Sequence, residues 1–206
     1  MGRINLLANK NLDAGLLKLH LTLSAEKQSQ LIAYLHLLQK WNKAYNLTAI
    51  TNFDKMISHH LLDSLSIASY ITGENIVDVG SGAGLPGIPL SVYFPERQFV
   101  LLDSIGKKTR FLNHIVRELK LQNVTVTQTR AEDYQVDILF DTMTARAVGS
   151  LEYLMTLSKH LLQKNGRLCA MKSDSKAEII PEGAEVILLS VPGIVTSRSL
   201  ILINNM

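Results

Sequence analysis

The sequence predicts an α/β fold, in which a mostly parallel sheet follows an N-terminal helical extension and ends in an antiparallel hairpin. Apolar residues recur at helical spacing through the first 72 residues. After Gly73, short apolar runs alternate with amphipathic segments, as in parallel sheets built from strand–helix–strand units. The last two apolar runs are joined by a loop too short for a crossover helix, so they should pair antiparallel. We therefore expect a helical extension over residues 1–72, packed on a sheet domain over residues 73–206.

Two stretches of regularly spaced apolar residues predict the helical extension. Ser24 is suited to cap the first helix, because its hydroxyl can accept a hydrogen bond from the first turn. The residues that share one face of this helix are Leu31, Tyr34, Leu35, Leu38 and Trp41. The second stretch repeats the pattern with Phe53, Ile57, Leu61, Leu65 and Ala68. We interpret both sets as core residues.

Short runs of apolar residues predict the strands of the sheet. The five expected parallel strands are residues 76–79, 99–103, 124–127, 138–144 and 167–171. Helices are expected between them, notably at residues 107–119 and 151–162. The remaining runs, residues 185–191 and 200–203, flank a loop with Pro192 and Gly193 and should form the terminal hairpin.

Composition and charge narrow the class of protein. Of 206 residues, 47% are hydrophobic and 19% charged, which excludes a disordered protein. The net charge of +3 (21 − 18) excludes a polybasic, histone-like protein but permits local contact with an anionic partner. Cys169 is the single cysteine, so neither a disulfide framework nor a cysteine-based zinc site can form. Because the sequence has no signal-peptide pattern and no apolar run near the ~20 residues that span a bilayer, we expect a cytoplasmic protein.

A glycine-rich turn directly after the first predicted strand is the strongest chemical signal. Asp78 is followed by Gly80, Gly82 and Gly84, which lack Cβ atoms and so permit a sharp turn close to a ligand. Open α/β sheets bind ligands at this end of their strands. Residues 82–87 match the dinucleotide pattern G-x-G-x-x-G. Asp78 with the three glycines instead matches the pattern typical of S-adenosylmethionine binding.

Methyl transfer is the favoured interpretation of this turn. Asp103 ends the next strand, where its carboxylate can accept hydrogen bonds from ribose hydroxyls, but both cofactors require such an acid. A dinucleotide pattern that begins at residue 82 starts too late, because the strand already breaks at Gly80. The chain also contains no Tyr-x-x-x-Lys pair of the kind that supports hydride transfer.

Metal and hydrolytic chemistry find little support in the sequence. His59 and His60 are adjacent, which suits a metal poorly, so we predict no metal site. No G-x-S-x-G nucleophile elbow occurs. We interpret His60 and Asp63 as partners in a local helix contact rather than as a catalytic pair.

Several segments together resemble the RsmG (GidB) family. Residues 41–50 read W-N-K-A-Y-N-L-T-A-I, and the glycine turn continues into G-L-P-G-I-P. The other matching segments are residues 60–64, 103–108 and 144–147. The resemblance implies a class I, Rossmann-like S-adenosylmethionine-binding methyltransferase domain. It also implies methylation of guanine N7 in 16S ribosomal RNA, at nucleotide 527 in the family's convention.

The resemblance further implies which residues bind the cofactor S-adenosyl-L-methionine. The family's contacts fall on Gly80, Leu85, Ala131, Glu132 and Arg146. Gly82 and Asp103 are added from the motif itself. Arg146 ends a predicted strand, where it would hold the cofactor carboxylate or an RNA phosphate.

Substrate RNA is expected to contact a basic segment after the second strand. Residues 107–120 carry five basic side chains and one acidic one, although a solvated helix face would explain the same pattern. The candidates for RNA contact are Lys107, Lys108, Arg110 and Arg146. The partner implied by the resemblance is 16S ribosomal RNA or the small ribosomal subunit, bound by a monomeric protein without a metal or a membrane.

The expected mechanism uses no general acid or base, so no catalytic residue is named. The N7 lone pair of guanine is available at neutral pH, and catalysis can rest on positioning and electrostatics. The alternatives are a class I methyltransferase for another RNA or a small molecule, and a dinucleotide-binding oxidoreductase.

Overall fold

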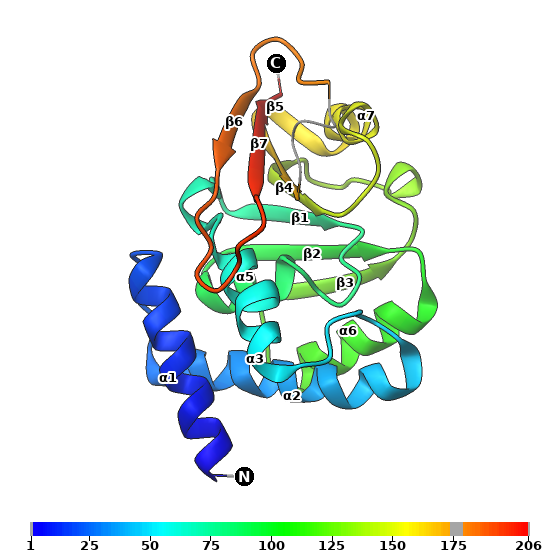
Figure 1. Cartoon of the computed structure of the whole chain (residues 1–206). Helices are drawn as coiled ribbons and strands as arrows, with labels where there is room; N and C mark the ends of the chain where they lie inside the picture. The colour runs from blue at the N-terminus through cyan, green and yellow to red at the C-terminus, as the bar shows by residue number, and fades with distance from the viewer. Residues whose placement is uncertain (1, 174–178, 206) are drawn as a thin grey trace.

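The computed structural model describes residues 2–173 and 179–205, which form one mixed sheet with helices around it (Figure 1). In this part of the chain seven strands lie in the order β3-β2-β1-β4-β5-β7-β6. The first five in that order run parallel, while β7 pairs antiparallel with both β5 and β6. The predicted α/β fold class, with its antiparallel C-terminal hairpin, is therefore confirmed. The strands are β1 (Asn75–Val79), β2 (Gln98–Asp103), β3 (Val124–Gln128), β4 (Phe140–Arg146), β5 (Leu162–Lys172), β6 (Glu185–Leu188) and β7 (Ser199–Asn204).

Two strands are shorter than their apolar runs predict. β4 begins only at Phe140, because Ile138 and Leu139 lie in the preceding loop and are 70% and 46% exposed. β6 ends at Leu188, and the chain then turns toward Pro192, which has no N–H to donate to a sheet. Apolar residues that continue beyond a sheet are indistinguishable in sequence from residues inside it.

The helices of the described residues agree with the prediction at their starts and depart from it near residue 57. Ser24 caps α2, since its hydroxyl accepts the Lys27 N–H at 3.3 Å. The second predicted helical stretch is divided into α3, a π-helical turn η1, α4 and a 3-10 turn η2. The full set is α1 (Gly2–Lys18), α2 (Ala25–Tyr45), α3 (Phe53–Met56), η1 (Ile57–Leu62), α4 (Asp63–Leu65), η2 (Ala68–Tyr70), α5 (Gly87–Tyr93), α6 (Gly106–Glu118), η3 (Ala131–Asp133) and α7 (Leu151–Leu161).

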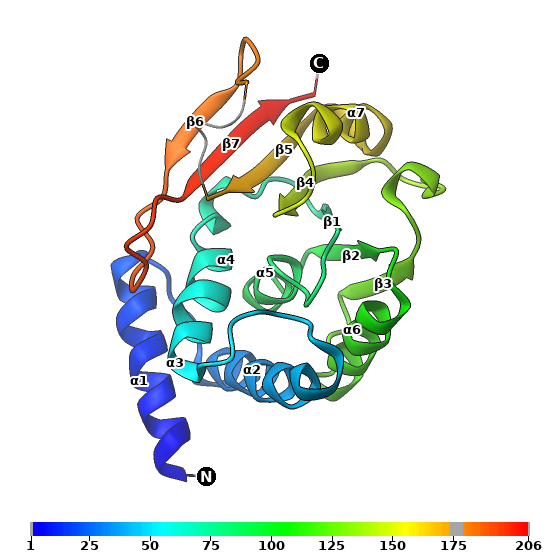
Figure 2. The same cartoon turned by 45° about the vertical axis from the view of Figure 1, so that its right-hand side comes forward.

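Helices cover both faces of the sheet (Figures 1 and 2). On one face, leucines of α7 pack against side chains such as Val77 and Met143. On the other face, α5 and α6 pack against Ile76 and Leu101, which alternate with the first set along the strands. The helix α2 lies outside α5 and α6 as a further layer, and α1 packs against α2 and η1. The N-terminal helices thus enclose one face of the sheet.

Tyr34 connects this outer layer to the glycine turn. Its side chain is fully buried, and its hydroxyl donates a 2.8 Å hydrogen bond to the Ala83 carbonyl. Its ring lies 6.5 Å from that of Phe111 on α6. Burial raises the pKa of the Tyr34 hydroxyl, so it stays protonated and acts as a donor.

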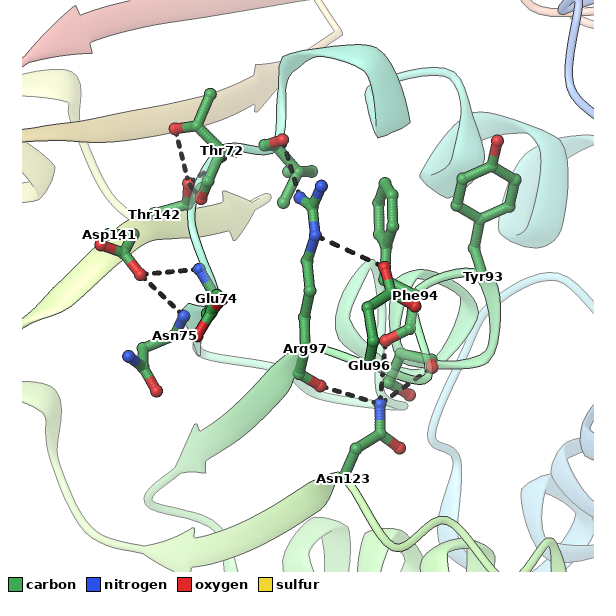
Figure 3. A network of polar contacts seen from close by, with 12 residues as sticks. Thr72, Glu74, Asn75, Tyr93, Phe94, Glu96, Arg97, Asn123, Asp141 and Thr142 are labelled. Carbon is green, nitrogen blue, oxygen red and sulfur yellow. Dashed lines mark hydrogen bonds and ion pairs between the residues drawn. The ribbon is translucent and has the colours of Figure 1, made fainter.

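The edge of the sheet where the parallel strands begin is held by side chains that bind backbone groups (Figure 3). Asp141 Oδ2 accepts the N–H groups of Glu74 and Asn75, both at 2.8 Å. Asn123 Nδ2 donates to the carbonyls of Ser91, Phe94 and Arg97 at 3.0 to 3.1 Å. These contacts hold the chain where β1 and β3 start.

Candidate functional site

The glycine turn joins β1 to α5 at the carboxyl edge of the sheet. Gly80, Gly82 and Gly84 have φ of +65°, +59° and +95°, a region that other residues adopt only with strain. At Gly80 space is also restricted, because a Cβ would lie 2.6 Å from Val148 Cγ2. The glycine at position 80 is therefore required both by its backbone conformation and by the close approach of the loop after β4.

Asp78 supports the turn from below. The residue is completely buried, and its carboxylate accepts hydrogen bonds from Thr144 Oγ1 at 2.9 Å and from the Gly87 N–H at 3.2 Å. Burial raises the pKa of Asp78 to about 6, and these hydrogen bonds oppose the shift. The acidic residue of the motif thus ties β1 to β4 and α5, and it is closed off from the solvent.

A cavity of about 260 Å³ opens beside the turn. It lies at the carboxyl ends of the central strands, where α/β sheets bind ligands. Four of the residues predicted to bind the cofactor line it, namely Gly80, Asp103, Ala131 and Glu132. The cavity brings these four together although the chain separates the first and the last by some fifty positions.

Asp103 is the best-connected acid of this cavity. Its Oδ2 accepts the Gly82 N–H at 2.9 Å and its Oδ1 accepts the Ile105 N–H at 2.9 Å. Lys108 Nζ lies 3.4 Å from Oδ2, and Lys108 also lines the cavity. The sequence assigned Lys108 to RNA contact, whereas the structure turns it toward this cavity.

The opposite wall of the cavity combines a backbone segment with a hydrogen-bonded pair. Ala131 and Glu132 form the turn η3 after β3, and Tyr153 of α7 donates a 2.9 Å hydrogen bond from its hydroxyl to Glu132 Oε1. Hydrogen bonds to the carboxylate, from its own backbone and from Tyr153, lower the pKa of Glu132. An ionised acceptor therefore stands at the mouth of the cavity.

Three further predicted cofactor residues lie outside the lining of this cavity, namely Gly82, whose N–H donates to Asp103, together with Leu85 and Arg146. Leu85 belongs to the hydrophobic core beneath the turn and is 9% exposed. Arg146 extends from the end of β4 toward the helices, where its Nη2 donates to the His59 carbonyl at 2.8 Å. Their predicted contacts with the cofactor stay predictions.

A second cavity, of about 210 Å³, lies next to the first and shares Ala147 with it. Arg146 Nη1 lies 3.2 Å from Asp63 Oδ2, and Arg198 Nε lies 3.2 Å from Asp63 Oδ1. Burial raises the pKa of Asp63, and the two arginines oppose that shift. All three residues line this cavity, although they come from α4, β4 and the loop before β7.

The predicted local contact between His60 and Asp63 is a backbone one, in which the Asp63 N–H donates to the His60 carbonyl, and their side chains are not paired among the described residues. His60 Nε2 instead lies 3.0 Å from Thr48 Oγ1, and the carboxylate of Asp63 faces the two arginines. The π-helical turn η1 changes the spacing on which a contact of residues i and i+3 depends. Burial, reinforced by Arg146, lowers the pKa of His60 to about 4, so the imidazole is neutral at pH 7.

The basic residues of α6 do not form one stripe. Lys107, Arg110 and Arg117 lie at positions i, i+3 and i+10, which share a helix face, while Lys108 points to the cofactor cavity. Arg117 is engaged locally, since it lies 3.0 Å from His114 and 3.6 Å from Glu118. The predicted RNA contacts of Lys107, Lys108, Arg110 and Arg146 stay predictions.

Sequence reasoning missed several residues of the two cavities. Tyr153 and Arg198 carried no motif, and they reach the site only through the packing of α7 and the course of the loop before β7. Asp63 lies in a segment that resembles the family, and that segment was the only signal for it. Among the described residues, no group of three or more histidine, cysteine or acidic side chains could hold a metal ion. No helix in this part of the chain has the length and apolar character needed to cross a membrane.

Comparisons with known proteins agree on one family. Residues 27–197 match the family described as GidB, rRNA small subunit methyltransferase G. A protein of that name from Coxiella burnetii (strain RSA 331 / Henzerling II) is 45% identical over 199 residues, which cover 95% of this chain and 98% of the relative. The protein of the same name from Marinobacter nauticus is 48% identical over 195 residues, 92% of this chain and 91% of the relative.

Solved structures share the fold at low sequence identity. The tRNA (m1A58) methyltransferase TrmI from Aquifex aeolicus matches with a TM-score of 0.57 and 13% identity, over 70% of this chain and 68% of that one. A SAM-dependent O-methyltransferase from Thermotoga maritima matches with a TM-score of 0.54 and 15% identity, over 70% and 64%. The sheet is therefore that of class I methyltransferases.

Proposed function

The chain belongs to the GidB family, rRNA small subunit methyltransferase G, and on this premise we propose that it methylates guanine N7 in 16S ribosomal RNA with S-adenosyl-L-methionine. The methylated position is nucleotide 527 in the family's convention. The main support for this cofactor is the cavity that Gly80, Asp103, Ala131 and Glu132 line together. The names of the relatives support the RNA substrate.

The residues of the cavity fit S-adenosylmethionine. Asp103 is a carboxylate at the end of β2 that would accept hydrogen bonds from the two ribose hydroxyls. Ala131 and Glu132 would address the adenine edge. Gly80 and Gly82 have no Cβ and leave the backbone of the turn open to the methionine part. When bound, the cofactor supplies a methyl group on a positively charged sulfur.

Methylation of N7 requires the protein to position the base and the cofactor, and it requires no proton transfer. The N7 lone pair forms the new bond while the carbon–sulfur bond breaks, and no proton has to leave the base. The side chains that line the first cavity include no histidine among the described residues. The role of the chain is therefore to hold two reactants in line and to exclude water.

The proposal also covers the residues that contact RNA, the roles of the two parts of the chain, its oligomeric state and its location. Lys107 and Arg110 on α6 would meet phosphates of 16S RNA or of the small subunit. Residues 1–72 would act as a helical extension of the S-adenosylmethionine-binding domain formed by residues 73–206. We propose a monomeric protein that works in the cytoplasm. The dinucleotide-dependent oxidoreductase that the glycine pattern left open finds no support among the relatives.

Methyl transfer to defined RNA tests this function. Small ribosomal subunits and naked 16S RNA from cells that lack the activity would be incubated with the protein and methyl-labelled S-adenosylmethionine. The label should appear as 7-methylguanosine at one position. The variant Gly80→Ala, which obstructs the turn, is the matched control and should give no label. Absence of label from both RNA substrates, or label on a different base, would contradict the proposal.

A further inference from the structure

Among the charged side chains that line the second cavity, Arg146 is also a predicted cofactor contact while Asp63 and Arg198 are not. Asp63, Arg146 and Arg198 meet there from three segments that are far apart in the chain. Asp63 is only 2% exposed, and the two arginine side chains are 19% and 18% exposed. Burying three charged groups is expensive unless they serve one another or a ligand.

Asp63 forms ion pairs with both arginines, but in the part of the chain that the structure describes some of the polar atoms of these side chains make no hydrogen bond. Asp63 Oδ1 and Arg146 Nη1 are buried, and within the described residues neither has a hydrogen-bond partner. Each lies 3.2 Å from an opposite charge, so the ion pairs exist without the geometry of a hydrogen bond. Asp63 Oδ1 and Arg146 Nη1 thus lie buried, each beside an opposite charge, in residues that line the cavity.

The second cavity lies directly beside the cofactor cavity. Ala147 lines both cavities, and it follows Arg146 at the carboxyl end of β4. Its φ of +55° is unusual for a residue with a Cβ, and this conformation turns the chain between the two cavities. A molecule in the second cavity therefore lies next to whatever occupies the first.

Size and charge indicate the kind of occupant. At about 210 Å³ the cavity is smaller than the about 300–1,000 Å³ of drug-sized ligand sites, so it suits one planar base. Lys172 also lines it, which gives three positive groups against the single carboxylate of Asp63. The positive surplus suits the phosphate of a nucleotide, and the carboxylate calls for an N–H donor on the same ligand.

We propose that this cavity receives the target guanine, and that Asp63 and the flanking arginines read its Watson–Crick edge. Guanine presents a carbonyl oxygen, O6, next to two donors, N1–H and the N2 amine. An arginine donor beside a carboxylate acceptor matches that order. Adenine and cytosine present an amine beside a ring acceptor, which reverses it. The inference rests on the proposed methylation of guanine and names the residues that select the base.

Recognition at this edge also orients the base for the reaction. N7 lies on the imidazole ring, away from N1 and the N2 amine. A guanine held by its Watson–Crick edge at Asp63 therefore turns the imidazole ring back toward the cavity opening and the neighbouring cofactor cavity. Enzymes that modify a base commonly take it out of its stack and read it in this way.

Inosine distinguishes base reading from a structural role of Asp63. Inosine keeps O6, N1–H and N7 and lacks only the N2 amine. Small subunits would be assembled on ligated 16S RNA that carries guanosine or inosine at the methylated position. For the wild-type protein we expect kcat/KM to fall about 10- to 100-fold with inosine, the effect of losing a hydrogen bond to a charged group.

The variant Asp63→Asn should remove this discrimination. It should lower kcat/KM for guanosine and bring the two substrates within about threefold of each other, because the carboxylate that needs the amine is gone. Its Kd for S-adenosylmethionine should stay within about twofold of the wild-type value. Asp54→Asn, an exposed acid elsewhere on the surface, is the matched control and should keep the full preference for guanosine.

Each outcome bears on the inference. Equal rates with guanosine and inosine in the wild-type protein would overturn it and leave the proposed function standing. A variant Asp63→Asn that loses activity but keeps the guanosine preference would reduce Asp63 to a structural role. Absence of methyl transfer to either RNA would contradict the proposed function itself. Because the wild-type comparison needs no variant, equal rates in it would overturn the inference even if Asp63→Asn does not fold.

Discussion

The two edges of the parallel sheet use polar side chains in opposite ways. Where the strands begin, Asn123 and Asp141 bind five backbone groups between them (Figure 3). Where the strands end, Asp103 and Asp63 line cavities, and Asp63 Oδ1 is buried there without a hydrogen-bond partner among the described residues. The first edge satisfies its polar groups within the protein, and the second keeps some for a ligand.

This difference separates stability from binding. A side chain that forms hydrogen bonds to backbone groups of the same protein contributes to the free energy of unfolding. A side chain held ready for a ligand contributes little to folding and much to affinity, as is common at functional sites. Substitutions at the two edges should therefore affect different measurements.

The largest effect is expected from Gly80→Ala. A Cβ at this position would lie 2.6 Å from Val148 Cγ2 on a backbone with φ of +65°, so the turn must move. We expect the Kd of S-adenosylmethionine, measured by calorimetry, to rise more than about 300-fold. Gly183→Ala is the matched control, because φ is +80° there and a Cβ would meet nothing within 4 Å. Similar losses of affinity from both variants would indicate a general disturbance of the fold and would contradict a local effect at the turn.

The next effect is expected at the opposite edge, from Asn123→Ala. Three carbonyls lose their shared donor, and at least one of them is buried. The free energy of unfolding, measured in urea, should fall by about 3 kcal/mol. The Kd of S-adenosylmethionine should stay within about twofold. A large loss of affinity without a loss of stability would contradict the division between the two edges.

Asp78 lies at the binding edge of the sheet but is fully buried, as residues with a structural role are. The pH dependence of the free energy of unfolding therefore tests whether it contributes to stability. Its pKa is raised from 3.8 to about 6 in the folded protein, so the folded state holds a proton that the unfolded state releases. Its contribution to stability is therefore complete below pH 3.8 and is lost as the pH rises through about 6.

The variant Asp78→Asn isolates that contribution. The difference in unfolding free energy between the wild type and the variant should shift against the wild type by roughly 2–3 kcal/mol between pH 4 and 7. Urea unfolding at several pH values measures it. A difference that does not change with pH would show that Asp78 is ionised throughout.

A smaller effect is expected from Asp103→Asn. The amide cannot accept charge-assisted hydrogen bonds from ribose hydroxyls, so the Kd of S-adenosylmethionine should rise about 30-fold, or about 2 kcal/mol. The melting temperature without cofactor should also fall, because the new amide nitrogen would face the N–H of Gly82 or of Ile105. Asp133→Asn, an exposed acid in η3, is the control and should leave Kd unaltered. An unchanged Kd for Asp103→Asn would remove this acid from the cofactor site.

The smallest effect is expected from His60→Gln. The imidazole is neutral at pH 7, with a pKa lowered to about 4, and it contacts Thr48 rather than an acid. Methyl transfer should stay within about tenfold of the wild-type rate, because the proposed reaction removes no proton. A loss of several hundredfold, with cofactor binding intact, would identify His60 as a general base.

The sequence predicts the fold and the cofactor cavity better than it predicts the second cavity. The turn from Asp78 to Gly84 is one continuous segment, and Asp103 ends the adjacent strand, so strand order alone brings them together. Asp63, Arg146 and Arg198 meet only because η1 winds as a π-helix and the loop before β7 runs beside η1. Spacing also gave no sign that Lys108 would line the cofactor cavity, since the direction of a side chain depends on where its helix begins.

The hydrogen bond from Tyr34 to the Ala83 carbonyl has an evolutionary consequence. The loop that would carry the cofactor takes one of its contacts from a helix nearly fifty residues upstream. The sheet cannot exchange that helix for an unrelated one without leaving a buried carbonyl unsatisfied. The helix and the loop should therefore be inherited together, and a relative that lacks the tyrosine should place another donor at the same point.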